Sequence, residues 1–254
     1  MKKTKREHKR KTQAESGSKA GSKKAQKAPV ERIEFVIGID EVGRGPLAGP
    51  VTVCGCMMPF SFYKNSYKQL GKMLNKNHKL SLAEIRDSKK LRESERERLF
   101  EKLNACADLR FALHSNTAKE IDARGIAVAI RASIAKILHA LIAESAKMSA
   151  SKSFDPSSVL VLLDGSLFAP AEFSNQRTII KGDDLEKAIS CASIYAKVSR
   201  DRFMKKLDRR LEKSSGFSYG FGIHKGYGTA AHRQAIKKFG LSDFHRKTFC
   251  RKMA

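Results

Sequence analysis

A short apolar segment, Phe35 to Ile39, ends in two adjacent carboxylates, Asp40 and Glu41, and soon enters the glycine-rich sequence GRGPLAGP. The apolar segment is typical of a buried strand. Carboxylates at a strand end, beside a loop that lets backbone approach a ligand, suit a hard divalent cation with a phosphate nearby. A solvated Asp-Glu pair at a strand exit, followed by an ordinary turn, explains these two residues alone equally well.

The remaining pattern mixes strands with helices. The segment 51–58 reads as a strand that pairs antiparallel with the first across the glycine-rich turn. Further strands are expected at 109–114, 159–163 and 177–180, and helices at 94–105, 117–145 and from 181 onward. The segment 60–82 has only a weak pattern. These elements predict an α/β fold with a mixed central sheet flanked by helices.

The chain is strongly basic, with a formal net charge of +25. Residues 1–31 are rich in Lys, Ser, Gly, Ala and Gln and lack apolar periodicity, so we predict a disordered basic tail at 1–31 and a folded domain at 32–254. The tail is either a solubilising segment or a weak auxiliary hold on nucleic acid. Basic charge favours a nucleic-acid binder, because neutralising phosphates releases counterions. Ribosome-associated and membrane-surface proteins share this charge.

We expect a cytoplasmic protein without a membrane span. No apolar stretch approaches the roughly 20 residues that a spanning helix needs. The N-terminus lacks the apolar segment of a secretory signal and has too few apolar residues for the amphipathic helix of a transit peptide. Scattered cysteines without zinc-site spacing indicate buried or neutral thiols in a reducing cytosol: Cys54, Cys56, Cys106, Cys191 and Cys250.

Asp164 repeats the setting of Asp40, because each is the first charged residue after an apolar strand and precedes a glycine-containing turn. If the two strands are parallel neighbours, their ends meet at one sheet edge, where ligand sites of open α/β sheets tend to lie. Asp183, at a helix start shortly after another strand, is a third contributor. With Glu41 these acids favour Mg²⁺ or Mn²⁺ over zinc. The cations would belong to the site, since crowded carboxylates repel one another.

Each acid also has a simpler explanation. Asp183 can serve only as a helix N-cap, and Asp164 can simply begin an Asp-Gly turn. Asp184 competes with Asp183 for any ligand role. The combination is more specific than its parts.

Several segments resemble, in order, those of the ribonuclease HII family. They are GIDEVGRGPLAGPV from Gly38, DSKKL from Asp87, LLDG from Leu162, KGDDLEKAISCASIYAKVSRDR from Lys181, HKGYGT from His224 and HRKTF from His245. The match covers 34–249. The Gly-Arg-Gly tripeptide argues against the sister group, ribonuclease HIII, which lacks it.

The resemblance implies a ribonuclease H-like fold with a helical C-terminal part that binds substrate. It implies an endonuclease that cuts the RNA strand of RNA–DNA hybrids and incises ribonucleotide-containing duplex DNA, leaving 5′-phosphate and 3′-hydroxyl ends. The metal-binding catalytic residues carried over by position are Asp40, Glu41, Asp164 and Asp183. A pair of Mn²⁺ or Mg²⁺ ions would hold the attacking water and the leaving oxygen on opposite sides of the phosphorus.

The resemblance also assigns substrate contacts. Gly43, Arg44 and Gly45 would read the ribose 2′-OH, and Tyr227 would pack on the sugar one step beyond. By itself Tyr227 reads as an ordinary tyrosine in a glycine-rich loop. Basic residues inside the matched segments are candidates for phosphate contacts, although each alone reads as a solvated charge: Lys89, Lys197, Arg200, Lys225 and Arg246.

Other expectations concern polar residues of the matched segments. Ser88 could cap the helix that follows it, and structural hydrogen bonding is the simpler role for His224 and His245. After Asp122 the family usually carries an Asn-containing stretch, which is replaced here by ARGIAV at 123–128. Any role of that polar stretch is therefore in doubt in this chain. We expect a monomer.

Two rival functions make different predictions. A non-catalytic basic nucleic-acid binder would be indifferent to divalent metal and to the 2′-OH, and it would leave the acids at the strand ends unexplained. A different metal-dependent nuclease or resolvase on the same fold would cut all-DNA junctions, and the Gly-Arg-Gly tripeptide argues against it.

Overall fold

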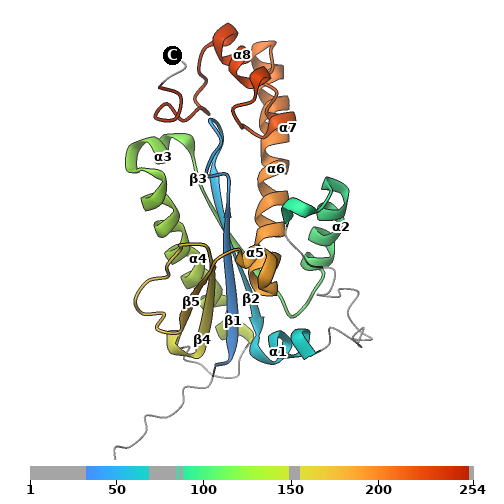
Figure 1. The fold of residues 1–254 in the computed structure, drawn as a ribbon, viewed down its shortest axis with the longest axis vertical. Coiled ribbons are helices and arrows are strands. Elements are labelled where there is room, and N and C mark those ends of the chain that lie inside the picture. The colour runs from blue at the N-terminus through green and yellow to red at the C-terminus, as the bar shows by residue number, and fades with distance from the viewer. Residues whose placement is uncertain (1–32, 69–84, 86–87, 149–154, 252–254) are drawn as a thin grey trace, which may run out of the picture. The chain divides into compact units, whose positions relative to one another are not determined.

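The structure, a computed structural model, describes residues 33–68, 85, 88–148 and 155–251. Its centre is a five-stranded sheet with the strand order β3-β2-β1-β4-β5 (Figure 1). The strands are β1 (Phe35–Val42), β2 (Val51–Pro59), β3 (Arg110–Asn116), β4 (Val159–Asp164) and β5 (Gln176–Ile179). β1 pairs antiparallel with β2 and parallel with β4, so the sheet is mixed, as predicted.

Two long helices cover the two faces of the sheet (Figure 1). α4 (Ile126–Met148) lies on one face and α6 (Lys187–Ser215) on the other. Side chains alternate between the faces: Ile37 and Ile39 of β1 pack on the α4 side, whereas Val36 packs on the α6 side. Burying each such side chain contributes about 1.5–3 kcal/mol to the stability of the fold. The core on both faces of the sheet therefore fixes the position of the strand ends that carry the acids.

Two glycines let the helices lie directly on the sheet. A Cβ on Gly38 of β1 would come within 2.1 Å of the carbonyl carbon of Ala188 in α6, and a Cβ on Gly55 of β2 within 2.6 Å of Cγ2 of Ile137 in α4. Any larger residue would push a helix away from the sheet. Gly38 thereby brings the N-terminal half of α6 close to the strand that carries Asp40.

Shorter elements complete the described chain. They are α1 (Phe60–Lys68), η2 (Ser88–Lys90), α2 (Glu93–Asn104), α3 (Ala118–Arg124), η3 (Pro156–Ser158), α5 (Gly182–Leu185), α7 (Phe221–His224) and α8 (Ala230–Phe239). The helical C-terminal part packs around its own cluster, which includes Met204, Leu207 and Phe221. The segment 60–82 begins with α1, and its remainder, like the predicted tail at 1–31, lies outside the described residues.

Several helix boundaries differ from the sequence prediction. The helix expected at 117–145 is divided at Gly125, whose φ of +77° ends α3 before α4 begins. The helix expected from 181 is also divided, because Glu186 is extended between α5 and α6. Asp183 is not an N-cap, since Lys181 occupies that position in α5. Ser88 does not cap α2, whose N-cap is Arg92.

α4 corrects the statement that no apolar stretch approaches membrane-spanning length. Its segment Ile126–Ser145 is long and apolar enough to cross a membrane by length and composition. The core helix of a packed domain has the same composition. Ile134, Ile137 and Leu138 are buried against the sheet, which accounts for the apolar character of this helix.

The cysteine prediction is confirmed in part. All five cysteines are free and buried. Burial raises the pKa of the Cys54 and Cys56 thiols well above the usual value, which keeps them neutral. They act as small apolar side chains of the core.

Candidate active site

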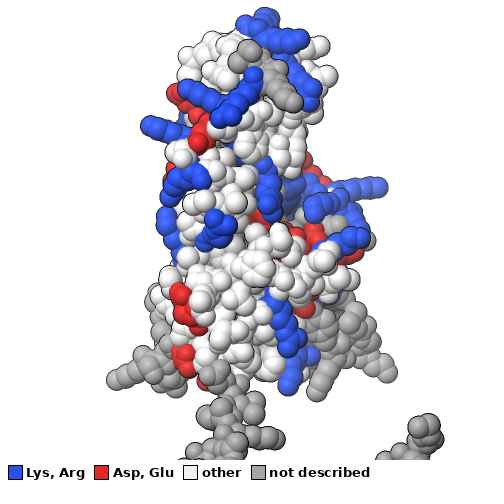
Figure 2. Space-filling view, turned by 60° about the vertical axis from the view of Figure 1, so that its left-hand side comes forward, with Lys and Arg blue, Asp and Glu red and all other residues white. Residues whose placement is uncertain are grey.

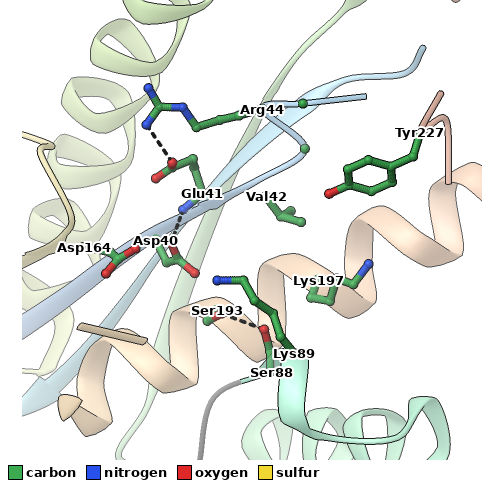
Figure 3. A pocket seen from close by; sticks show the side chains of 12 residues that line it. Asp40, Glu41, Val42, Arg44, Ser88, Lys89, Asp164, Ser193, Lys197 and Tyr227 are labelled. Carbon is green, nitrogen blue, oxygen red and sulfur yellow. Dashed lines mark hydrogen bonds and ion pairs between the residues drawn. The ribbon is translucent and has the colours of Figure 1, made fainter. Parts of the chain in front are cut away.

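Three acidic side chains converge at the carboxyl ends of β1 and β4. The parallel register pairs Ile39 with Leu163, so the next residues, Asp40 and Asp164, lie side by side across the two strands. Glu41 follows in β1, which continues to Val42 and thus holds both acids on rigid backbone. Asp40, Glu41 and Asp164 line an open pocket of about 360 Å³ (Figure 3).

The pocket disfavours unpaired negative charge. Asp40 is only 7% exposed, and its burial, together with the charges of Glu41 and Asp164, raises its pKa to about 8. Burial also raises the pKa of Glu41, although Arg44 opposes this. Within the described residues, Glu41 Oε2 is buried without a hydrogen-bond partner. These all-oxygen ligands, one of them unsatisfied, fit a hard divalent cation.

Asp183 is adjacent to this group but differently engaged. It is buried, and its Oδ2 accepts a 2.8 Å hydrogen bond from Lys89 Nζ. Asp164 Oδ1 accepts a 2.7 Å hydrogen bond from the backbone N–H of Gly182, next to Asp183. In the described part of the chain, no three His, Cys, Asp or Glu side chains are grouped closely enough to hold a metal as they stand. The structure thus gathers three of the four predicted acids in the pocket and pairs the fourth with a lysine.

The glycine-rich loop after β1 forms one wall of the pocket. Gly43 has a φ of +89°, and a Cβ there would come within 2.3 Å of Arg200 Nε. Gly45 is different, because the nearest atom to its added Cβ is Tyr227 Cε1 at 3.8 Å. Arg44 projects outward, 51% exposed, with its Nη1 3.1 Å from Glu41 Oε1. Gly43 is therefore required by the loop itself, whereas Gly45 keeps the space beside Tyr227 open.

Two buried arginines hold this loop by its carbonyl groups. Arg246 donates to the carbonyl oxygens of Gly43 (2.7 Å), Arg44 (2.9 Å) and Gly49 (3.0 Å). Arg200 donates to those of Pro50 (2.9 Å), Lys225 (3.0 Å) and Ala48 (3.3 Å). The placement of both guanidinium groups, away from solvent, does not support the predicted phosphate contacts. Arg200 and Arg246 position the loop instead.

Asp122 anchors the segment that carries Arg246. Its carboxylate accepts hydrogen bonds from the backbone N–H groups of Lys247 (2.7 Å) and Thr248 (3.0 Å). Burial opposes ionisation here, but these bonds and that of the Thr248 hydroxyl hold the pKa of Asp122 below its usual range. Neighbouring residues of the C-terminal segment are thus fixed by α3 and by the glycine-rich loop.

The predicted lysine contacts have different surroundings. Lys89 and Lys197 line the pocket, and Lys197 Nζ lies 2.9 Å from Asp201 Oδ1. Lys225 is buried and donates to the carbonyl oxygen of Gly222. Tyr227 lines the pocket and is 44% exposed, so its ring is accessible to a ligand.

Two serines line the pocket, a role that the sequence did not predict for either of them. Ser88 and Ser193 contact each other at 2.9 Å between their Oγ atoms (Figure 3). A hydrogen bond from Ser193 partly opposes the rise in the pKa of Asp40. Ser193 lies in α6, the helix that Gly38 brings close to β1. Ser193 lies one helical turn after the buried Ile189, and this spacing was the sequence signal that could have placed Ser193 on the side of α6 that faces β1.

The histidines of the C-terminal part form a buried structural cluster. Nε2 of His232 lies 3.0 Å from Nε2 of His245, and neither residue lines the pocket. His224 Nε2 hydrogen-bonds the carbonyl oxygen of Tyr219. The structural role expected for His224 and His245 is the one that the structure shows.

Figure 2 shows the surface on the α4 side. Among the charged side chains of its upper part, most are Lys or Arg, and acidic side chains are few. An open acidic pocket on a basic surface suits a phosphodiester that approaches a cation, because surface cations attract the polyanion.

The mixed sheet, the acidic pocket at its strand ends and the basic surface define a class: metal-dependent nucleases of ribonuclease H-like architecture. A family model described as Ribonuclease HII matches residues 37–252. The chain belongs to the ribonuclease HII family. It is a metal-dependent endoribonuclease that acts on RNA–DNA hybrids.

Individual relatives agree with this assignment. The ribonuclease HII of Geobacillus kaustophilus is 38% identical over 217 residues, 85% of this chain and 68% of that protein. That of Campylobacter concisus is 36% identical over 84% of this chain and 92% of that protein. Two solved structures share the fold: ribonuclease H2 from Pyrococcus horikoshii (TM-score 0.58, 23% identity, 86% and 96% of the two chains) and Bst-RNase HIII in complex with Mn²⁺ (TM-score 0.58, 14%, 94% and 77%).

Proposed function

We propose that Asp40, Glu41, Asp164 and Asp183 together hold a pair of Mg²⁺ or Mn²⁺ ions. Such ions activate a water molecule and neutralise charge on the phosphate in hydrolysis that leaves 5′-phosphate and 3′-hydroxyl ends. The observation that carries the proposal is the convergence of three carboxylates in one pocket, of which Asp40 is buried and Glu41 has an unsatisfied oxygen. Asp183 would join the site if its carboxylate exchanged Lys89 for a cation.

Ribose recognition is assigned to the glycine-rich loop. A protein distinguishes RNA from DNA by contacts with the 2′-OH, which require close approach to the sugar. Gly45 has no Cβ to block that approach, and the carbonyl groups of Gly43 and Arg44 are fixed by Arg246. The loop is therefore organised before substrate arrives.

Tyr227 is assigned to the neighbouring sugar. Its ring lies across a gap from Gly45 and is half exposed within the pocket wall (Figure 3). A flat ring packs well on a deoxyribose face, but an added hydroxyl would crowd it. With the loop on the ribose and Tyr227 on the next deoxyribose, the site would select a ribonucleotide followed by DNA, which supports incision at single ribonucleotides in duplex DNA.

Lys89 and Lys197 are the two predicted basic contacts whose placement suits a phosphate in the pocket. Lys89 is 77% exposed, so its ammonium group can leave Asp183 for the substrate. Lys225 and Arg246 contact backbone carbonyl groups, and in that position they organise the protein rather than the substrate. The proposed working form is a cytoplasmic monomer of a catalytic domain at 32–254, with the basic tail at 1–31 as an auxiliary hold on the duplex.

The test is cleavage of duplex DNA that carries one ribonucleotide, with Mg²⁺ or Mn²⁺, by the wild type and by Asp40→Asn. The proposal predicts cleavage by the wild type and a rate at least about a hundredfold lower for the variant, since one metal ligand is lost. Wild-type inactivity with both metals, or full activity of the variant, would overturn it. Metal-independent binding without cleavage would favour the non-catalytic rival, and cutting of all-DNA junctions would favour the resolvase.

A further inference from the structure

A second pocket, of about 220 Å³, shares a wall with the first. Arg44 lines both pockets, so they are neighbours on one surface. The second pocket lies between the N-terminal turns of α4, which contribute Arg131, and the loop after β4, which contributes Phe168. That loop follows Asp164, the last residue of β4, so Phe168 lies four residues after a proposed metal ligand.

Phe168 is an aromatic side chain held out in solvent by a fixed loop. It is 64% exposed, whereas Leu167 beside it is buried in the core at 7%. Gln176 Oε1 accepts a 2.8 Å hydrogen bond from the backbone N–H of Ala169, and its Nε2 donates to the carbonyl oxygens of Phe173 (3.1 Å) and Ala169 (3.3 Å). A large exposed ring on pinned backbone is a ready stacking surface.

The charge of the second pocket complements a nucleic-acid backbone. Its two charged lining residues, Arg44 and Arg131, are both cationic, and none of its lining residues is acidic. Arg131 is exposed, and the hydrogen bonds and ion pairs found among the described residues leave its guanidinium without a protein partner. A phosphate can therefore bind there without displacing an existing ion pair.

The position of the second pocket relative to Tyr227 indicates which side of the scissile phosphate it would bind. Figure 3 shows the Arg44 side chain and Tyr227 on opposite sides of the loop after β1, with Asp164 on the Arg44 side. A strand that crosses the acidic pocket from Tyr227 leaves it over Arg44 toward the second pocket. With Tyr227 on the sugar beyond the ribonucleotide, the second pocket lies on the 5′ side of the scissile phosphate.

We propose that the second pocket is a subsite for the nucleotide on the 5′ side of the scissile phosphate, where Phe168 stacks on its base or sugar and Arg131 binds its phosphate. This inference rests on the proposed function of the acidic pocket. It assigns substrate binding to two residues that lie outside the segments resembling the family signatures.

The test compares Phe168→Ala and Arg131→Ala on labelled duplexes with one central ribonucleotide. On the full duplex, we expect Phe168→Ala to raise KM roughly fivefold to tenfold, which is the lower range for the loss of one stacking contact. The single-turnover cleavage rate should stay within about twofold of the wild type. Phe168→Trp should restore the wild-type KM. Arg131→Ala should raise KM and reduce the slope of log affinity against log salt by about one phosphate contact.

Shortened duplexes make the prediction specific for one side. A product-like duplex that begins with the 5′-phosphate of the ribonucleotide has no bond to cleave, so Phe168→Ala and Arg131→Ala are compared on it by binding affinity. Their affinities should equal that of the wild type there, because the wild type also lacks the contact. When the duplex is shortened on the Tyr227 side, both defects should persist. Phe203→Ala on α6, another exposed phenylalanine (44%), and Lys136→Ala on α4 serve as matched controls with wild-type KM.

The outcomes separate this inference from the proposed function. Wild-type KM for both variants on the full duplex, or equal defects on all duplexes, would overturn the subsite. The proposed function fails only if the wild type does not cleave with either metal or if Asp40→Asn cleaves at the full rate. Thermal unfolding temperatures of Phe168→Ala and Arg131→Ala should match the wild type, because both side chains are exposed, so altered KM values report on binding.

Discussion

Nη2 of Arg246 donates a 2.7 Å hydrogen bond to the carbonyl oxygen of Gly43, although the two residues are 203 positions apart in the sequence. The same guanidinium also holds the carbonyl groups of Arg44 and Gly49. The end of the folded chain thus fixes the backbone of the loop that faces the acidic pocket. The guanidinium presents its donors in a rigid planar fork, whereas a lysine ammonium is a single compact charge, so lysine is not an equivalent residue here.

Arg246→Lys should therefore impair ribose recognition more than metal binding. An ammonium group cannot reproduce the three hydrogen bonds, so we expect the free energy of unfolding to fall by about 2–3 kcal/mol and kcat/KM to fall about tenfold or more. Mn²⁺ affinity should stay near the wild-type value, because the carboxylates are untouched. Urea denaturation, steady-state cleavage and Mn²⁺ titration together measure these effects.

Arg251→Lys, at an exposed position in the same segment, is the control and should change none of these quantities. A tenfold loss of Mn²⁺ affinity in Arg246→Lys would contradict the positioning role.

The two glycines of the tripeptide should respond differently to alanine. Gly43→Ala places a Cβ 2.3 Å from Arg200 Nε at a φ of +89°, so we expect a loss of about 2–4 kcal/mol of stability. Gly45→Ala meets no atom closer than 3.8 Å, so its stability should stay within about 0.5 kcal/mol of the wild type. Its kcat/KM should nevertheless fall about tenfold, because the methyl group enters the gap beside Tyr227.

Thermal denaturation and cleavage kinetics distinguish the two variants. Equal loss of stability in both would contradict the different roles assigned to Gly43 and Gly45. Full activity of Gly45→Ala would show that the sugar does not enter the gap.

Asp40→Asn should stabilise the metal-free protein. The folded-state pKa of Asp40, about 8, lies above its unfolded value of 3.8, so the ionisable group costs stability as pH rises between these values. In a chelator at pH 7.5, we expect the variant to be more stable by about 1–3 kcal/mol. Mn²⁺ should stabilise the wild type through binding and the variant much less.

Chemical denaturation with and without Mn²⁺ measures this prediction. Asp243→Asn, at an exposed position outside the pocket, should behave like the wild type in both conditions. Asp40→Asn would refute the account if it were less stable without metal and gained as much from Mn²⁺ as the wild type.

Acid should destabilise the C-terminal part through its buried histidines. Burial lowers the pKa of both His232 and His245 from 6.5 to about 4. Their neutral forms therefore stabilise the fold above pH 6.5, and this contribution is lost as pH falls from about 6.5 through 4, by up to roughly 1.4 kcal/mol per pH unit for each histidine. Urea denaturation at several pH values should show this slope. His245→Gln should reduce it and His139→Gln, an exposed control, should not; an unchanged slope in His245→Gln would contradict the assignment.

Local sequence patterns were sufficient to predict the sheet and the acids at its edge. The apolar strands that end at Asp40 and Asp164 give a direct prediction, because parallel strands bring their carboxyl ends together. The mixed sheet and the antiparallel hairpin of β1 and β2 followed from the short glycine-rich connection and are confirmed.

Long-range partners could not be predicted in the same way. Arg246 looks like a phosphate contact in the sequence, because nothing nearby reveals that its partners are carbonyl groups at the other end of the chain. The division of the helix at Gly125 depends on one backbone angle that sequence periodicity ignores. The pairing of Asp183 with Lys89 depends on how η2 packs beside α5, which short-range pattern does not specify.

The most direct measurement of the central claim is calorimetric titration of Mn²⁺ into the wild type, Asp164→Asn and Asp243→Asn. If Asp164 shares cations with Asp40 and Glu41, the wild type and Asp243→Asn will show the same saturable binding, and Asp164→Asn will lose most of it. Equal Mn²⁺ binding by all three proteins would show that the acids gathered at the ends of β1 and β4 do not form the metal site.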